Sequence, residues 1–95
     1  MQFLVHIQVD MSPDIDPDLK TRLFAAERAR ARELADEGTL LRLWRIPGRT
    51  ANWGLWEVAD ATALHEALTS LPLFPYLDIE VQPLAQHPSD PAAAS

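Results

Sequence analysis

The chain has 95 residues, no cysteine and a net charge of −6 at pH 7. A chain of this length forms one domain, and the lack of cysteine excludes a disulfide framework and any thiol nucleophile. Its negative charge argues against binding to a phosphate backbone, so no nucleic-acid partner is expected. The first ten residues alternate in polarity and show no signal-peptide pattern, which favours a cytoplasmic protein with no membrane partner.

The chain begins with a predicted strand and helix. Residues 2–9 alternate between apolar and polar side chains, with the apolar face formed by Phe3, Val5, Ile7 and Val9. A turn-rich segment then leads to Asp16, a helix N-cap, and the helix continues to about Glu37. Glu27 and Arg30 fall near the inward stripe of this helix, where leucine or alanine is usual, so their charges need an explanation.

Two further strands are predicted over 39–46 and 51–58, joined by the short turn "PGRT" into an antiparallel hairpin. Strict alternation in the first of them places Leu40, Arg42, Trp44 and Ile46 on one face and Leu41, Leu43 and Arg45 on the other. In the second, Trp53 and Leu55 face away from Trp56 and Val58.

The last elements are a short helix and a strand. Asp60 caps the helix, whose apolar stripe is Leu64, Leu68 and Leu71. The apolar run "LPLFPYLDIEV" follows at 71–81, and its two prolines exclude a helix through it. A strand over about 78–84 completes the domain.

The order β-α-β-β-α-β predicts an α+β, ferredoxin-like fold: a four-stranded antiparallel sheet with two helices on one face. We expect a single domain over 1–86 and a flexible tail or arm over 87–95. The sheet face without helices carries large apolar side chains, and an exposed apolar face of that size indicates a partner surface. Self-association into a homo-oligomer is the expected solution.

Several side chains are candidates for chemistry, each with a more ordinary alternative. Glu27 could be a general base at the edge of an apolar cavity, or a surface carboxylate paired with a neighbouring arginine. Asn52 could donate to an oxyanion, or bond to local backbone at the end of a turn. Arginines near the hairpin could bind a carboxylate substrate or remain solvated, and these are Arg42, Arg45 and Arg49.

Metal and cofactor sites are not indicated. His6, His65 and His87 are too scattered for a metal-ligand spacing, and no glycine-rich phosphate loop occurs. His6 could contact a ligand from the sheet or be a surface or interface histidine. Trp53 and the other two tryptophans are first of all core and interface residues. We therefore expect neither a metal nor a cofactor.

Three stretches resemble the muconolactone delta-isomerase family: "LWRIPGRTANWGLWEV" at 43–58, "ALHEALTSLPLFPYLDIEV" at 63–81, and "HP" at 87–88. The resemblance implies a ferredoxin-like fold and assembly into rings of dimers, usually decamers. It also implies a role in the catechol branch of the β-ketoadipate pathway. There the family moves one proton of muconolactone, a small lactone carboxylate, to form the enol-lactone of 3-oxoadipate without metal or cofactor.

The resemblance assigns roles to residues by position. It implies that Glu27 shuttles the proton and that Asn52 is a polar catalytic contact to the lactone. Thr50 stands where the family commonly has a tyrosine that points into the site, which leaves the exact lactone open. The residues expected to bind substrate are His6, Arg45, Thr50, Trp53, Phe74 and Tyr76, with Phe74 and Tyr76 walling a small apolar pocket near a subunit boundary.

Three alternatives stay open at this point. The chain could be a chloromuconolactone dehalogenase, which expels chloride after the same deprotonation. It could isomerise a related butenolide. It could also be a non-catalytic relative that binds a small ligand, which would exchange none of the ligand's acidic hydrogens.

Overall fold

The computed structural model describes residues 1–94 of the chain and the side chains of residues 1–92. Its element order confirms the predicted β-α-β-β-α-β fold. The strands are Gln2–Val9 (β1), Leu40–Arg45 (β2), Ala51–Glu57 (β3) and Leu77–Leu84 (β4), and the helices are Pro17–Asp36 (α1) and Ala61–Thr69 (α2). Two short 3-10 turns, Phe74–Tyr76 (η1) and Pro91–Ala94 (η2), precede and follow the last strand.

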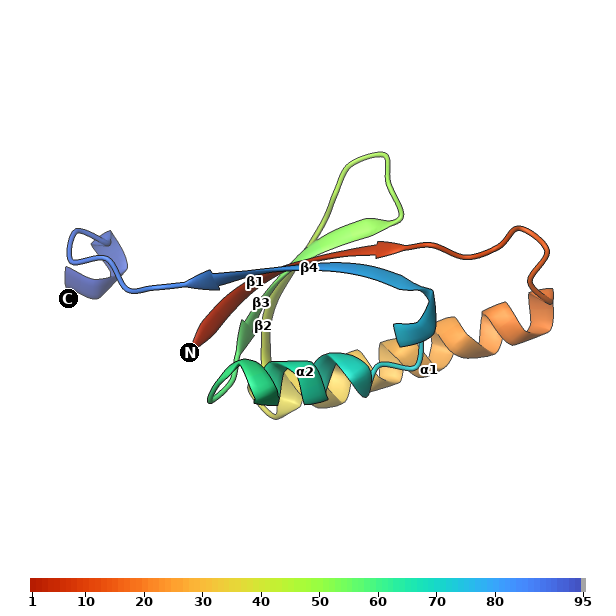
Figure 1. Cartoon of the computed structure of the whole chain (residues 1–95), viewed down its shortest axis with the longest axis horizontal. Helices are drawn as coiled ribbons and strands as arrows, with labels where there is room; N and C mark the ends of the chain where they lie inside the picture. Colours follow the sequence, from red (N-terminus) through yellow and green to blue (C-terminus); the bar gives the residue numbers. More distant parts are fainter. Residues whose placement is uncertain (95) are drawn as a thin grey trace.

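The four strands form one antiparallel sheet in the order β2-β3-β1-β4, and both helices lie on the same face of it (Figure 1). The inward face of β1 packs against the helices, as its alternation predicts. The buried cluster between sheet and helices consists of Phe3, Val5, Ile7, Leu34, Trp56, Leu64, Leu68 and Leu71. This cluster fixes which strand positions face the helices and which face away.

Each helix begins at the aspartate that the sequence indicates. The Asp16 carboxylate accepts a hydrogen bond from the Leu19 N–H at 3.0 Å, and the Asp60 carboxylate accepts one from the Ala63 N–H at 2.8 Å. These bonds satisfy backbone donors that a helix start leaves free. After α1 the chain reverses at Gly38, whose φ of 80° suits a residue without a Cβ.

The facing predicted for β2 is wrong beyond its first residue. The pairing with β3 shifts between Leu40 and Arg42, so the strand carries a bulge there. A bulge inserts one extra residue and reverses the alternation after it. Leu40 therefore shares the helix-side face with Leu43 and Arg45, while Arg42 and Trp44 lie on the other face. The β3 residues paired with the three helix-side positions are, in the same order, Trp56, Gly54 and Asn52.

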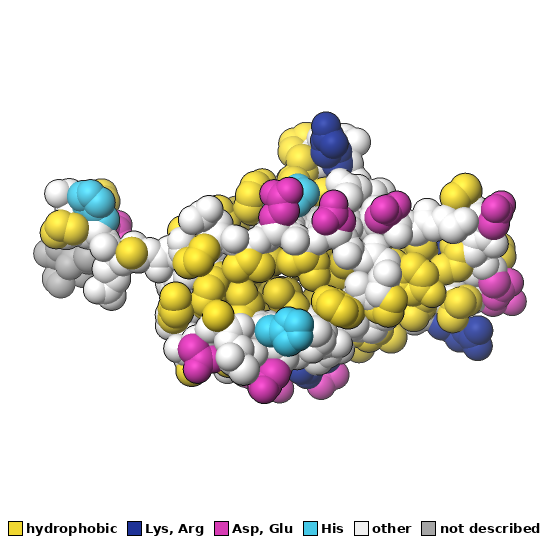
Figure 2. Space-filling view, in the orientation of Figure 1, with side chains coloured by type: hydrophobic (Ala, Val, Ile, Leu, Met, Phe, Trp, Pro, Cys, Tyr) yellow, Lys and Arg dark blue, Asp and Glu magenta, His cyan; other side chains and the backbone are white. Residues whose placement is uncertain are grey.

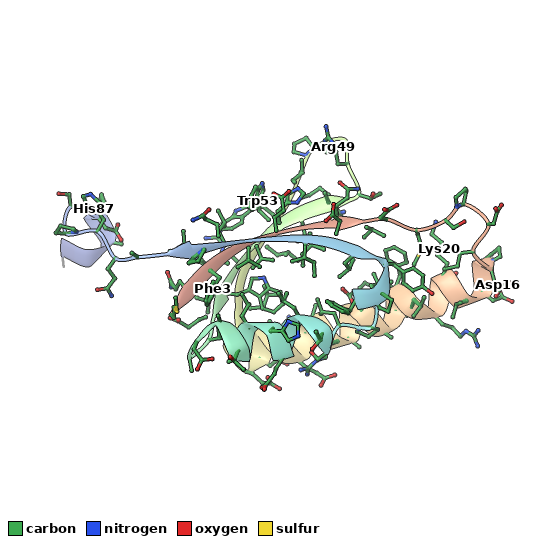
Figure 3. All side chains as sticks on the ribbon, in the orientation of Figure 1. Phe3, Asp16, Lys20, Arg49, Trp53 and His87 are labelled. Atoms are coloured by element: carbon green, nitrogen blue, oxygen red, sulfur yellow. The ribbon has the colours of Figure 1, made fainter. Side chains whose placement is uncertain are left out.

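The sheet face without helices carries aromatic side chains. Trp44 is 42% exposed and Trp53 37% exposed, and the two are directly paired across β2 and β3. The His6 ring lies edge-on to the Trp53 ring with 5.0 Å between centroids. Figure 3 shows Trp53 on this open face and Phe3 on the opposite side, between the sheet and the helices. The chain covers these rings only in part, with the Arg42 guanidinium 4.9 Å from the Trp44 ring centroid.

The molecule is elongated, because one segment extends beyond the sheet at each end. The first turns of α1 extend past the sheet on one side, and the segment after β4 stands away from the body on the other (Figures 1 and 2). The radius of gyration is 14.8 Å, whereas a compact domain of this length has about 12 Å. The segment 85–94, called the C-terminal arm below, ends in η2. Ser95, the end of the predicted tail, lies outside the described residues.

Candidate active site

A cavity of about 240 Å³ lies between α1, the helix-side face of the sheet and the segment that follows α2. Most of its lining is aliphatic or aromatic, contributed by every strand and by α1. Its polar lining residues are Glu27, Arg28, Arg45, Thr50 and Asn52. A mostly apolar pocket with a few convergent polar groups is the usual form of a small-molecule site.

Glu27 reaches this cavity from the middle of α1. Its side chain is half-buried, and its Oε1 accepts a hydrogen bond from the Leu73 N–H at 3.1 Å. Burial away from water raises the pKa of Glu27 above its ordinary value of 4.5, and the Leu73 hydrogen bond partly opposes that rise. A carboxylate with a raised pKa in an apolar cavity suits general acid–base catalysis.

The proline-rich segment explains how the Leu73 N–H becomes available. Leu71 to Phe74 form a turn in which the Phe74 N–H donates to the Leu71 carbonyl at 2.9 Å. Pro72 fixes the second position of this turn, and Leu73 has the φ of −83° and ψ of −1° typical of the third position in a type I turn. That position's N–H takes no part in the turn's own hydrogen bond, so it is free to hold the Glu27 carboxylate.

Two buried polar atoms near the cavity have no hydrogen-bond partner among the described residues: Asn52 Oδ1 and Trp56 Nε1. Both residues belong to β3 and both line the cavity. Leaving a buried polar group unpaired costs about 1–3 kcal/mol. Such atoms therefore mark positions where a bound ligand or water would complete the hydrogen bonding.

Three further polar or charged residues line the cavity: Arg28, Arg45 and Thr50. Thr50 Oγ1 accepts a hydrogen bond from the Gln8 side-chain amide at 3.2 Å, which orients its hydroxyl. Among the described side chains, Arg28 and Arg45 form no ion pair. The described lining thus holds two cationic side chains, Arg28 and Arg45, and one acidic side chain, Glu27. This balance of charge favours an anionic ligand.

The cavity brings together four of the eight residues expected from the sequence: Glu27, Arg45, Thr50 and Asn52. The other four lie elsewhere in the single chain. His6 and Trp53 occupy strand positions that face away from the helices, because alternation places them opposite the cavity. Phe74 is 37% exposed and Tyr76 is partly buried in η1, and neither lines the cavity. The turn before η1 directs Leu71 and Leu73 inward instead.

Three features of the site were missed from the sequence. Arg28, adjacent to the singled-out Glu27, lines the cavity and was not considered as a ligand group. Trp56 was taken only as a core residue, although its indole N–H is a polar atom that needs a partner when buried. The Leu73 N–H could not be found from side-chain chemistry, because it is a backbone group.

No three His, Asp or Glu side chains within residues 1–92 gather as a metal-binding group would. The helices of the described chain are also too short or too polar to span a bilayer.

Comparison with known proteins decides the family. A family model described as muconolactone delta-isomerase matches residues 1–90. The chain belongs to the muconolactone delta-isomerase family. A member from Pseudomonas aeruginosa is 46% identical over 94% of this chain and 93% of its own length, and one from Pseudomonas putida is 45% identical over the same shares. The family identified by resemblance is thereby confirmed.

Solved structures agree with this family. A crystal structure of a muconolactone isomerase superposes with a TM-score of 0.90 at 46% identity, covering 96% of this chain and 95% of that one. A 5-chloro-2-hydroxyhydroquinone dehydrochlorinase from Burkholderia phenoliruptrix superposes with a TM-score of 0.63 at 15% identity. It covers 92% of this chain and 96% of its own, and at that identity it shows the shared fold alone.

Proposed function

We propose that this protein is a muconolactone delta-isomerase that converts muconolactone to the enol-lactone of 3-oxoadipate. The reaction removes the proton from ring C4, which gives a 2-oxyfuran dienolate, and returns a proton to C2. The double bond thereby moves from C2–C3 to C3–C4. The observation that carries this function is Glu27, a half-buried carboxylate with a raised pKa at an apolar cavity in a chain of this family.

Glu27 is the group that moves the proton. In its charged form one carboxylate oxygen takes the C4 proton, and the same carboxyl then delivers a proton to C2. The Leu73 N–H holds Oε1, which leaves the second oxygen free to face the substrate. An apolar surrounding excludes water, so the proton is returned to the dienolate rather than lost to solvent.

The other polar residues bind and orient the lactone carboxylate. Arg45 and Arg28 offer cationic partners for its carboxymethyl arm, because neither is paired with an acid among the described side chains. Asn52 supplies an amide that can contact the lactone, and Thr50 a hydroxyl that Gln8 orients. These contacts place C4 and C2 within reach of a single carboxyl group.

A direct assay tests this function. Purified protein is mixed with muconolactone in heavy water, and NMR follows both the appearance of the enol-lactone and deuterium at C2. Isomerisation supports the proposal, and binding without isomerisation or exchange would contradict it and favour a non-catalytic relative. Parallel reactions with chloromuconolactone, monitored for released chloride, separate isomerase from dehalogenase.

We further propose that the active form is a homo-oligomer that acts in the cytoplasm. As the family resemblance implies, it would be built from dimers and form a decamer. The uncovered apolar face supports association, since Trp44 and Trp53 are more than a third exposed there. The elongated single chain supports it as well, because the C-terminal arm stands away from its own domain (Figure 1). In such an assembly Phe74 and Tyr76 would meet a neighbouring chain.

A further inference from the structure

The indole of Trp56 carries a hydrogen-bond donor that no group in the described chain uses. The side chain is 2% exposed and lines the cavity, and its Nε1 is buried without a partner among the described residues. Buried indole N–H groups normally find an acceptor. If Trp56 only filled the core, a phenyl or leucyl side chain would do so without an unpaired donor.

Gly54 leaves room for the N–H edge of the indole because it has no side chain. A Cβ on Gly54 would lie 2.7 Å from Trp56 Nε1 and 3.3 Å from its Cδ1, and real Cβ atoms essentially never approach so closely. The N–H edge of the indole therefore lies over Gly54. Since Asn52, Gly54 and Trp56 are successive helix-side positions of β3, the indole leans along the strand toward Asn52.

Asn52 carries a second unpaired polar atom on the same helix-side face of β3. Its Oδ1 is buried and has no partner in the described chain, and the two residues do not hydrogen-bond to each other. A donor and an acceptor thus stand unpaired at positions 56 and 52 of one strand, and the indole edge lies over Gly54 between them. Of these two atoms, the Trp56 Nε1–H is the one that suits an oxygen acceptor on a small ligand.

We propose that the Trp56 Nε1–H donates a hydrogen bond to the lactone carbonyl oxygen and stabilises it as it becomes the oxyanion of the dienolate. The inference rests on the proposed isomerase function. The substrate has two oxygen-bearing groups. With Arg28 and Arg45 as the proposed partners of its carboxylate, the lactone would lie toward the other polar groups of the lining, which include Asn52 and Trp56. A fixed donor in a dry site stabilises developing negative charge more than the ground-state carbonyl, so its main effect is on kcat.

Substitution of the indole tests this role. Trp56→Phe keeps an aromatic ring and removes the N–H, and we expect kcat for muconolactone to fall at least about tenfold with a smaller change in KM. Phe3→Leu, a conservative change of a buried core side chain that does not line the cavity, is the control for loss of packing. Gly54→Ala displaces the indole edge, so it should lower kcat in the wild type and have much less effect in the Trp56→Phe background. Retention of kcat within twofold in Trp56→Phe would overturn the proposal.

A spectroscopic measurement tests the same hydrogen bond without catalysis. The probe is tetronate, the stable enolate anion of a five-membered lactone, added to ¹⁵N-labelled wild-type protein. The indole N–H resonance of Trp56, assigned by its absence in Trp56→Phe or by sequential assignment, should move downfield at saturation, while that of Trp44 should not. An unmoved Trp56 resonance in tetronate-saturated protein, or no tetronate binding, would overturn the proposal.

The two tests separate the possible failures. If the wild-type protein does not isomerise muconolactone, the proposed function fails, and the tetronate titration alone decides whether Trp56 is a ligand donor. If Trp56→Phe does not fold, the titration of the wild type again decides. The proposal requires the downfield shift in every case, and the loss of kcat wherever a folded variant can be assayed.

Discussion

At the scale of single residues, Glu27 carries the proposed chemistry. It faces an apolar cavity, its charge is disfavoured by burial, and the Leu73 N–H fixes one of its oxygens at 3.1 Å. Glu27→Gln keeps the shape and an oxygen for that hydrogen bond but cannot accept a proton. We expect the variant to fold and to lose at least about 100-fold in kcat, as removal of a general base does.

The control for this variant is Glu33→Gln, a change of the same kind on the exposed side of α1, where the Glu33 side chain is 62% exposed and pairs with Arg30. Its kcat should match the wild type. Near-normal turnover by a folded Glu27→Gln protein would exclude Glu27 as the proton carrier.

The pH dependence of Glu27 can be predicted with its sign. Because the base must be charged, kcat/KM should fall as the pH drops through its raised pKa, which lies above 4.5. The effect on stability runs the other way. A carboxyl whose pKa is higher in the folded state stabilises the fold when protonated, and that contribution disappears as the pH rises through the folded pKa.

We therefore expect the wild type to lose stability relative to Glu27→Gln as the pH rises from below 4.5 through the folded-state pKa. Urea unfolding of both proteins across this range measures the difference. A difference that is constant with pH would contradict the raised pKa.

At the scale of elements, the turn between α2 and β4 is a positioning device for Glu27. Pro72 fixes the turn that presents the Leu73 N–H, and this hydrogen bond lowers the pKa that burial raises. Pro72→Ala should loosen the turn and weaken the hydrogen bond. The acid limb of the kcat/KM profile should then move to higher pH.

Pro75→Ala is the matched control for this turn, because Pro75 lies in η1 and is exposed. Its pH profile should coincide with that of the wild type. An unchanged acid limb in Pro72→Ala would show that the turn does not depend on proline to hold the carboxylate.

The elements also show how far the sequence alone could lead. The fold, both helix starts and the inward face of β1 followed from periodicity and capping, because these are local signals that the core reinforces. The facing of β2 did not, since a bulge adds a residue without a marker in an apolar run. The roles of Glu27 and Asn52 came from family resemblance. The lining of the cavity by Leu71 and Leu73 was not predicted, because Pro72 indicates a turn but not which of its neighbours face inward.

At the scale of the whole molecule, the single chain is elongated and leaves part of one sheet face exposed. One sheet face exposes Trp44 and Trp53, and the radius of gyration of 14.8 Å exceeds that of a compact domain. We expect sedimentation equilibrium at micromolar concentration to give a mass that is a multiple of 10.6 kDa, at least a dimer. We expect burial of the two indoles to drive this association, at about 25 cal/mol per Å² of apolar surface.

A double substitution tests whether the open sheet face mediates the expected association. Trp44→Glu with Trp53→Glu places two like charges side by side on the open face, directly opposite each other across β2 and β3. The variant should sediment as a smaller species than the wild type. A wild-type protein that is folded, active and monomeric would contradict the predicted assembly and its use of this face.

The alternation of β3 has a consequence for how this enzyme can change over evolution or in the laboratory. Its even-numbered positions 52, 54 and 56 face the helix side, where Asn52 and Trp56 line the cavity, and its odd-numbered positions 53 and 55 face the open side of the sheet. The positions proposed for substrate contact and those proposed for subunit association therefore alternate along this one seven-residue strand. Substitutions within one set can be selected without altering the other, whereas a single inserted or deleted residue would exchange the two sets and damage both properties together.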